Sequence, residues 1–206
     1  MKRHRPAIQN GKPSTVRDRI LSTASKLFYK NGVHSVGVDL VVAESGIAKT
    51  SLYRHFGNKD SLVAAFLKAE DADFWRQWDA IAERHPSDPQ GELEAYLDWM
   101  DVRLKRPGYR GCPQLNVVAE LADARHPARR IAIRHKERMR ERLTDIAARM
   151  KLTDPEAVGS QLALAFDGAF MSAPLGTGDR MAITLRQTIN ALLRAAPQVR
   201  NARLRP

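Results

Sequence analysis

The sequence lacks paired cysteines and long apolar runs. Cys112 is its only cysteine, so the chain can form neither an internal disulfide framework nor a thiolate metal cluster, which fits a reducing compartment. No apolar run approaches the roughly 18 residues that a membrane-spanning helix requires. The basic N-terminus also lacks the apolar core of a signal peptide. We therefore expect a cytoplasmic protein that does not have a membrane as its partner.

Signatures of catalysis are missing as well. The six histidines show no metal-ligand spacing, and neither H-E-x-x-H nor C-x-x-C occurs. The Gly-Thr-Gly at 176–178 has no strand pattern before it, and no serine lies in a nucleophile-elbow motif. We expect no enzyme activity, no catalytic residue, no metal and no cofactor.

Negative charge is the minority charge. The 206 residues contain 34 Lys and Arg against 23 Asp and Glu, a net charge of +11, and such an excess attracts nucleic acid or anionic lipid. Residues 1–60 contain eleven Lys or Arg and four acids, a net of +7, which leaves 11 − 7 = +4 for the remaining 146 residues. The basic charge is therefore concentrated near the N-terminus.

Helical periodicity dominates what is present. Apolar residues recur at spacings of three and four, and alternating strand patterns are missing, which predicts an all-α fold. The first helix is expected after Thr15 and should end at Asn31-Gly32. Two short helices, 38–45 and 47–56, and a long one, 58–84, should follow. Breaks at 86–89, 105–113, 126–127, 152–156 and 173–179 then predict about five more helices, with flexible basic tails at 1–13 and 197–206.

Gly46 separates the two short helices, as the tight turn of a helix-turn-helix requires. Val41, Ile47 and Leu52 are spaced to lock the helices together. The second helix would then present donors able to reach phosphates and base edges in a major groove: Lys49, Thr50, Ser51, Tyr53, Arg54 and His55. An ordinary amphipathic surface is the alternative, but the turn, the flanking helices and the basic charge favour DNA binding.

The run VDLVVAESGIAKTSLYRHFGNKDSL resembles the DNA-binding domain of the tetracycline-repressor (TetR) family, over roughly residues 14–74. The resemblance implies base-facing positions for Lys49, Thr50 and Arg54. It implies phosphate contacts for Tyr53, His55 and Lys59, and core positions for Phe56 and Leu62. Two residues depart from the family pattern: Gly37 replaces a Ser or Thr cap, and Val42 replaces a small residue.

One helix-turn-helix contacts few base pairs, so specificity normally requires two copies on a palindromic operator. The last two long helices are the candidates for a homodimer interface, because each has a broad apolar face and small residues; the resemblance implies the same. The expected interface residues are Leu162, Ala165, Ala169, Leu185, Ile189 and Leu192. The alternative is that both helices belong to the core of one subunit.

Aromatic and Met residues between these regions can form either core or a ligand pocket. The resemblance implies an effector-binding and dimerisation domain over 75–196, in which a small molecule moves the long linking helix. The pocket candidates are Tyr96, Trp99, Met100, Cys112, Leu115, Asn116, Phe166 and Phe170. Cys112 is either a buried apolar residue or an electrophile or oxidant sensor.

The stretch 125–142 is strongly basic. We interpret it as a solvated helix face, with Ile131, Met139 and Leu143 inward and Glu137 and Glu141 paired with neighbouring arginines. An anionic effector or an additional DNA contact is the alternative.

These patterns together predict a homodimeric, small-molecule-responsive transcriptional regulator, a repressor released from a palindromic operator by its effector. Two other classes stay open. One is a constitutive or architectural DNA-binding protein without an effector. The other is a helical small-molecule carrier or enzyme with an incidental basic surface.

Overall fold

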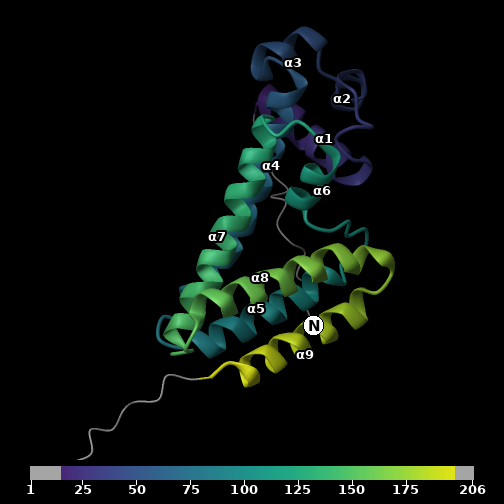
Figure 1. The fold of residues 1–206 in the computed structure, drawn as a ribbon. Coiled ribbons are helices and arrows are strands. Elements are labelled where there is room, and N and C mark those ends of the chain that lie inside the picture. The colour runs from purple at the N-terminus through teal and green to yellow at the C-terminus, as the bar shows by residue number, and fades with distance from the viewer. Residues whose placement is uncertain (1–14, 198–206) are drawn as a thin grey trace, which may run out of the picture. The chain divides into compact units, whose positions relative to one another are not determined.

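The computed structural model describes residues 15–197; the predicted tails at 1–13 and 197–206 lie outside these residues, apart from Pro197. Regular structure in the described part is helical (Figure 1). The elements are α1 (Val16–Asn31), α2 (Val38–Ser45), α3 (Lys49–Phe56), α4 (Lys59–Ala82), α5 (Pro89–Leu104), α6 (Pro113–Glu120), α7 (Pro127–Arg149), α8 (Pro155–Ser172), the 3-10 helix η1 (Ala173–Leu175) and α9 (Gly178–Ala195). The all-α prediction is confirmed, and α5 to α9 lie between the predicted breaks.

The chain forms two compact units that divide within α4. Phe66 ends the first unit and Leu67 begins the second. The domain boundary expected from the sequence, at residue 74, lies further along the same helix. None of the helices described between residues 15 and 197 is long and apolar enough to cross a bilayer.

Capping residues set the helix ends of the first unit. The Thr15 hydroxyl accepts a hydrogen bond from the Asp18 N–H at 3.1 Å and begins α1. Gly32 follows α1 with a φ of 87°. Gly46 follows α2 in the left-handed region, with a φ of 64°, which a residue with a side chain rarely adopts. This conformation lets the chain turn directly from α2 into α3.

A small apolar core holds the first unit together. Its buried side chains include Ile20, Ala24, Phe28, Val33, Val36, Val41, Leu52, Phe56, Leu62 and Phe66. The rings of Phe28 and Phe66 lie 5.8 Å apart and link α1 to the start of α4. Of the three expected locking residues, Val41 and Leu52 are buried and Ile47 is half-buried. Ile47 therefore contributes less to this core than the sequence suggested.

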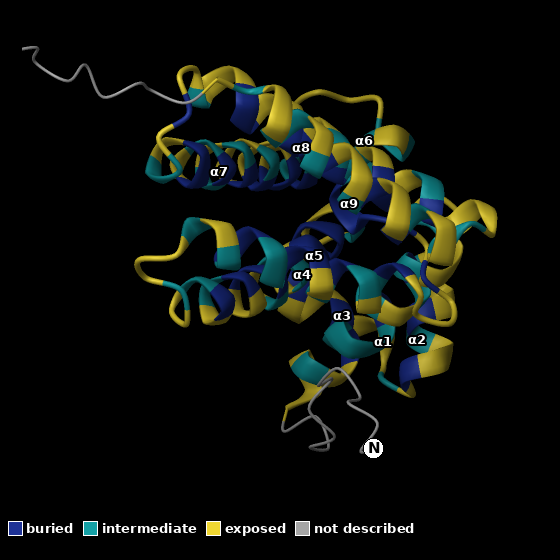
Figure 2. Cartoon of the chain, turned by 90° about the horizontal axis from the view of Figure 1, so that it is seen from below, coloured by how far each residue is buried: buried dark blue, intermediate teal, exposed yellow. Residues whose placement is uncertain are grey.

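Proline and aspartate begin the helices of the second unit. Asp88 and Asp154 each accept a backbone N–H three residues on, and a proline occupies the first helical position of α5 and of α8. The helices pack most extensively as α7 on α8, α8 on α9, α6 on α7 and α9 on α5. In Figure 2, buried and exposed residues alternate along α8 and α9, as expected of amphipathic helices.

Candidate nucleic-acid interface

Helix α3 has one buried side and one polar side. Leu52 and Phe56 are four residues apart, so they lie on one face and enter the core of the first unit. The polar side chains lie mainly outside: Lys49, Thr50, Tyr53, Arg54 and His55 are exposed, and Ser51 is half-buried. Packing thus leaves the predicted DNA-contacting residues accessible. Their contacts with DNA stay a prediction.

Helix α3 begins later than its apolar pattern suggested. Ala48 has an extended ψ of 138°, and its carbonyl accepts the N–H groups of Ser51 and Leu52. The first helical residue is therefore Lys49 and not Ile47. Because helix N-termini carry partial positive charge, the Lys49 ammonium lies where an anion is favoured.

Lys49 has a partner that sequence reasoning did not identify. Its Nζ lies 2.7 Å from Oδ1 of Asp39 on α2. The hydrogen bond and negative charge of Asp39 raise the pKa of Lys49, although desolvation acts slightly against this. Ten residues separate the two positions in sequence, and only the turn at Gly46 brings them together. No periodicity in the sequence signals such a pair.

The turn after α3 leads into the predicted phosphate-binding residue Lys59. The side-chain oxygen of Asn58 accepts the Ser61 N–H at 2.8 Å and caps α4. Lys59 is the first residue of α4 and is half-buried. It therefore lies at a helix end that favours anions. On α3, Arg54 donates to the Ser51 hydroxyl at 3.4 Å, a long hydrogen bond.

Two arginines of α1 serve the fold of the first unit. Arg19 donates to the Ser45 carbonyl at 2.8 Å, which satisfies an acceptor at the end of α2. The Arg17 guanidinium lies 5.0 Å from the centre of the Phe56 ring. The basic residues counted over 1–60 therefore do not all serve to bind a partner. Arg17 and Arg19 help to position the helices on which the exposed basic residues lie.

The unusual residue Gly37 begins α2 without a side-chain cap. No side-chain hydrogen bond is present at this N-cap, whose φ is −79°. A Cβ built at Gly37 would meet nothing within 4 Å. The departure from the family pattern is thus a missing cap and does not reflect crowding.

Comparisons with known proteins agree with this geometry. The family model described as "Bacterial regulatory proteins, tetR family" matches residues 20–66. The crystal structure of SCO4454, a TetR-family transcriptional regulator from Streptomyces coelicolor, is 33% identical and superposes with a TM-score of 0.83. That match covers 86% of this chain and 94% of SCO4454.

The chain belongs to the TetR family of transcriptional regulators.

Two further relatives are consistent with this membership. A TetR-type regulator (sav143) from Streptomyces avermitilis is 32% identical, with a TM-score of 0.77 over 92% of this chain and 100% of that one. The HTH-type transcriptional regulator LmrA of Bacillus subtilis is 35% identical over 115 residues, which span 55% of this chain and 61% of LmrA. The relatives of this chain identify it as a DNA-binding regulator of transcription and not an enzyme.

The predicted effector residues of this regulator gather in the core of the second unit. Tyr96, Met100, Cys112, Phe166 and Phe170 are buried there, and Trp99 and Leu115 pack against them. Asn116 donates to the Arg110 carbonyl at 2.8 Å. Two surface grooves of this unit, of about 420 and 280 Å³, are lined by other residues. An effector role for the predicted set therefore stays a prediction.

The aromatic rings of this core lie close together. Tyr96 stacks on Trp78 with a centroid distance of 3.9 Å, and its hydroxyl donates to Glu92 at 2.9 Å. Burial, assisted by the Glu92 hydrogen bond, raises the pKa of Tyr96. Glu92 also pairs with Arg149 of α7. Cys112 is buried, and its thiol lies 3.3 Å from Oε1 of Gln114, as a donor to it.

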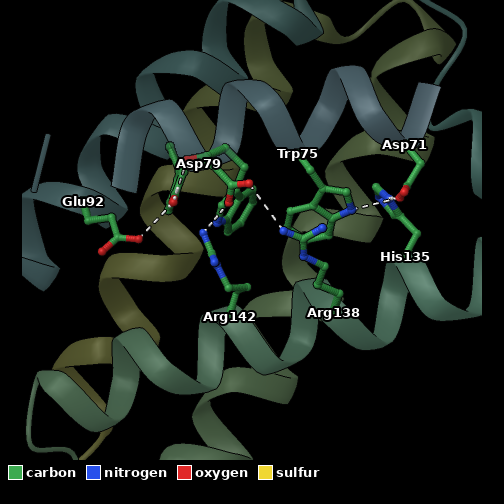
Figure 3. Close-up of polar contacts among 9 residues, drawn as sticks. Asp71, Trp75, Asp79, Glu92, His135, Arg138 and Arg142 are labelled. Carbon is green, nitrogen blue, oxygen red and sulfur yellow. Dashed lines mark hydrogen bonds and ion pairs between the residues drawn. The ribbon is translucent and has the colours of Figure 1, made fainter. Parts of the chain in front are cut away.

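Polar side chains join α4 to α7 within the second unit (Figure 3). The His135 Nδ1 lies 2.7 Å from Asp71 Oδ1, which also accepts the Trp75 Nε1–H at 2.8 Å. Because this carboxylate requires donors, His135 carries its proton on Nδ1. Burial lowers the pKa of His135 to about 4, aided by the charges of Lys136 and Arg103 and opposed by Asp71. The sequence offered no signal that Asp71 faces His135.

The basic stretch on α7 is bonded differently from the prediction. Ile131, Met139 and Leu143 are buried as expected. Three of the arginines, however, pair with acids of other helices: Arg138 and Arg142 contact Asp79 of α4 at 3.4 and 2.6 Å, and Arg140 contacts Glu156 of α8 at 3.2 Å. The spacing of the charges along the sequence indicates partners on the same helix only. Much of this basic charge thus joins helices inside one unit.

The predicted dimer residues lie mostly inside the second unit. Leu162, Ala169, Leu185 and Ile189 are buried within their own chain, so they offer little surface to a partner. Ala165 and Leu192 are half-buried. The exposed apolar residues of this region are Leu164, Met171, Leu175 and Ile183, of which Leu175 is 79% exposed. The predicted residues share the helical period of the buried face, and their contribution to a dimer interface stays a prediction.

Proposed function

We propose that the protein is a homodimeric repressor that binds a palindromic operator and is released when a small molecule binds. Residues 14–74 would form the DNA-binding domain, and residues 75–196 the effector-binding and dimerisation domain. The observation that supports DNA recognition best is the two-sided α3, with Leu52 buried and Arg54 exposed. Such a helix can enter a major groove without losing its packing in the protein.

The proposed contacts divide into two kinds. Lys49, Thr50 and Arg54 read base edges, with Ser51 beside them, because the N-terminal part of a recognition helix approaches the bases most closely. Tyr53, His55 and Lys59 hold phosphates. Lys59 is supported in this role by its position at the N-terminal end of α4.

DNase footprinting on genomic fragments tests the DNA-binding part. We expect a short protected palindrome with half-sites one or more helical turns apart, about 34 Å per turn. Protection without sequence preference would support an architectural protein instead. An absence of binding to any duplex would support the carrier or enzyme class and overturn the proposal.

We propose that the protein dimerises through the outer sides of α8, η1 and α9, and the exposed apolar residues there support this proposal. Leu164, Leu175 and Ile183 are each more than half exposed, and exposed apolar patches commonly mark protein interfaces. Ile183→Glu combined with Leu164→Glu should convert dimers to monomers in sedimentation experiments. Val102→Glu on α5 is the control, because Val102 is also exposed, at 68%, but lies on another helix. Equal behaviour of both variants would contradict this interface.

Effector control requires a ligand that binds the DNA-free form better than the DNA-bound form. A thermal-shift screen identifies candidates, because a ligand at 100 times its Kd stabilises the folded protein by about 2.7 kcal/mol. The candidate must then weaken binding to the footprinted site. A ligand that stabilises the protein and leaves DNA affinity unchanged would favour a constitutive regulator.

The sign of regulation rests on the family, whose members are typically repressors. The relatives of this chain include one named a repressor and one named an activator. A reporter gene placed behind the footprinted site should rise in expression when the regulator is deleted. A fall in expression would identify an activator.

A further inference from the structure

The first unit carries a negative charge on the surface proposed to bind a polyanion. Asp39 is in the first turn of α2, and its side chain is 81% exposed. Its Oδ1 lies 2.7 Å from the Lys49 ammonium, which is itself 52% exposed. The N-cap of α2 is Gly37, which has no side chain, and the interaction of Asp39 that joins α2 to α3 is its ion pair with Lys49. Its partner is the first residue of α3.

Lys49 has an unfavourable position without Asp39. It lies at the N-terminus of α3, where the helix dipole is positive, and the first turn of α3 contains no acidic residue. A carboxylate nearby offsets both positive charges. In the free protein, Asp39 thus supplies the negative charge that the Lys49 ammonium and this helix end favour.

We propose that Asp39 is a specificity-determining residue that keeps Lys49 from binding phosphates on DNA of any sequence. Exposed ion pairs are weak. A phosphate that takes the place of Asp39 beside Lys49, however, leaves the Asp39 carboxylate unpaired next to a polyanion. Binding of Lys49 to the edge of a guanine base does not require the Asp39–Lys49 ion pair to break. The ammonium has three N–H donors, so it can bind guanine O6 or N7 while Asp39 keeps its hydrogen bond.

The consequence is a lower affinity for non-specific DNA at little cost to specific DNA. Neutralising Asp39 frees one cation per protomer for phosphate contact. Each added phosphate contact steepens the dependence of log K on log salt by about 0.9. We expect Asp39→Asn to bind random duplex about three- to tenfold more tightly at low salt, by the same counterion argument. The ratio of specific to non-specific affinity should fall accordingly.

The test is a double-mutant cycle on the full chain with Asp39→Asn, Lys49→Gln and the double variant. The probes are a 30-base-pair random-sequence duplex and the duplex that the natural protein selects from a randomised library. Affinity is measured by fluorescence anisotropy between 50 and 200 mM salt. The gain of Asp39→Asn on random duplex should disappear in the Lys49→Gln background.

Glu44→Gln is the matched control. Glu44 is exposed on the same helix and its loss changes the net charge equally, so it reports the general effect of removing one negative charge. The inference is overturned if Glu44→Gln equals Asp39→Asn, or if the Asp39→Asn gain survives without Lys49. It is also overturned if Asp39→Asn weakens only the selected duplex, since Asp39 would then read a base itself.

The inference rests on the proposed role of α3 in DNA binding. Arg54→Ala distinguishes a failure of the inference from a failure of that proposed role. If Arg54→Ala weakens binding while the Asp39–Lys49 cycle shows no coupling, only the inference fails. If neither Arg54→Ala nor Lys49→Gln affects any duplex, the proposed interface itself is wrong. Circular dichroism of each variant checks that the exposed substitutions leave the fold intact.

Discussion

The two units use the same charged residue types in different ways. In the second unit, Arg142 and Arg149 bond to carboxylates of other helices, and Glu92 among these acids is buried. In the first unit, Lys49 has an exposed carboxylate partner and Arg54 a long hydrogen bond to a hydroxyl. A cation held by a buried acid is part of the fold. A weakly held, exposed cation can exchange its partner for DNA at small cost.

The largest expected effect on stability comes from removing the buried carboxylate of the second unit, Glu92. Glu92→Ala leaves the Tyr96 hydroxyl and the Arg149 guanidinium without their shared carboxylate. Arg149 is 31% exposed and also pairs with Asp145, so the loss should be at most the about 3 kcal/mol that removing one partner of a buried pair costs. Urea unfolding at fixed protein concentration should show this loss. Glu92→Gln, which keeps acceptor and shape, should lose less; an equal loss would show that charge alone matters.

Acidification should weaken the same unit through His135. Its pKa is lowered to about 4 in the folded protein, against about 6.5 in an unfolded chain. The unfolded state therefore binds more protons between these pH values, and stability falls as the pH decreases from 6.5 to 4, by up to about 3 kcal/mol. His135→Asn, which can still donate to Asp71, should flatten this part of the stability profile. An unchanged dependence of stability on pH would show that another titratable group causes the loss of stability.

Substitutions on α3 and at the first residue of α4 should change DNA binding without comparable losses of stability. Arg54→Ala should alter the preference at one base pair by about 1–3 kcal/mol. Lys59→Ala should instead weaken binding to all duplexes alike and reduce the salt slope by about 1. Binding-site selection followed by salt titration distinguishes these outcomes. Equal losses on selected and random DNA for both variants would remove the division into base and phosphate contacts.

The smallest expected effect concerns the missing cap of α2. Gly37→Ser should stabilise the first unit by about 0.5–1 kcal/mol, because it adds an acceptor and restricts the unfolded chain. The open space around Gly37 and its negative φ permit the side chain. Thermal melting measures the gain. A lower melting temperature would show that this N-cap requires glycine.

Much of the fold followed from local patterns in the sequence. Helix α1 begins after Thr15 as expected, Asp154 caps the helix that follows the predicted break at 152–156, and Gly46 ends α2. These features depend on residues within one turn of each other, so a linear pattern contains them. The interface residues were less accessible to this reasoning. Leu162 and Leu164 both belong to apolar positions of α8, and only the neighbouring helices decide which one is buried.

The sequence by itself determined an all-helical chain, the helix-turn-helix around Gly46 and the cationic side of α3, because helix periodicity, capping and charge act over a few residues. Tertiary structure decided the partners: Asp39 for Lys49, Asp71 for His135 and Glu92 for Arg149. These pairs join separate helices, and their formation depends on how apolar faces pack. No local pattern encodes which charges that packing brings within hydrogen-bonding distance.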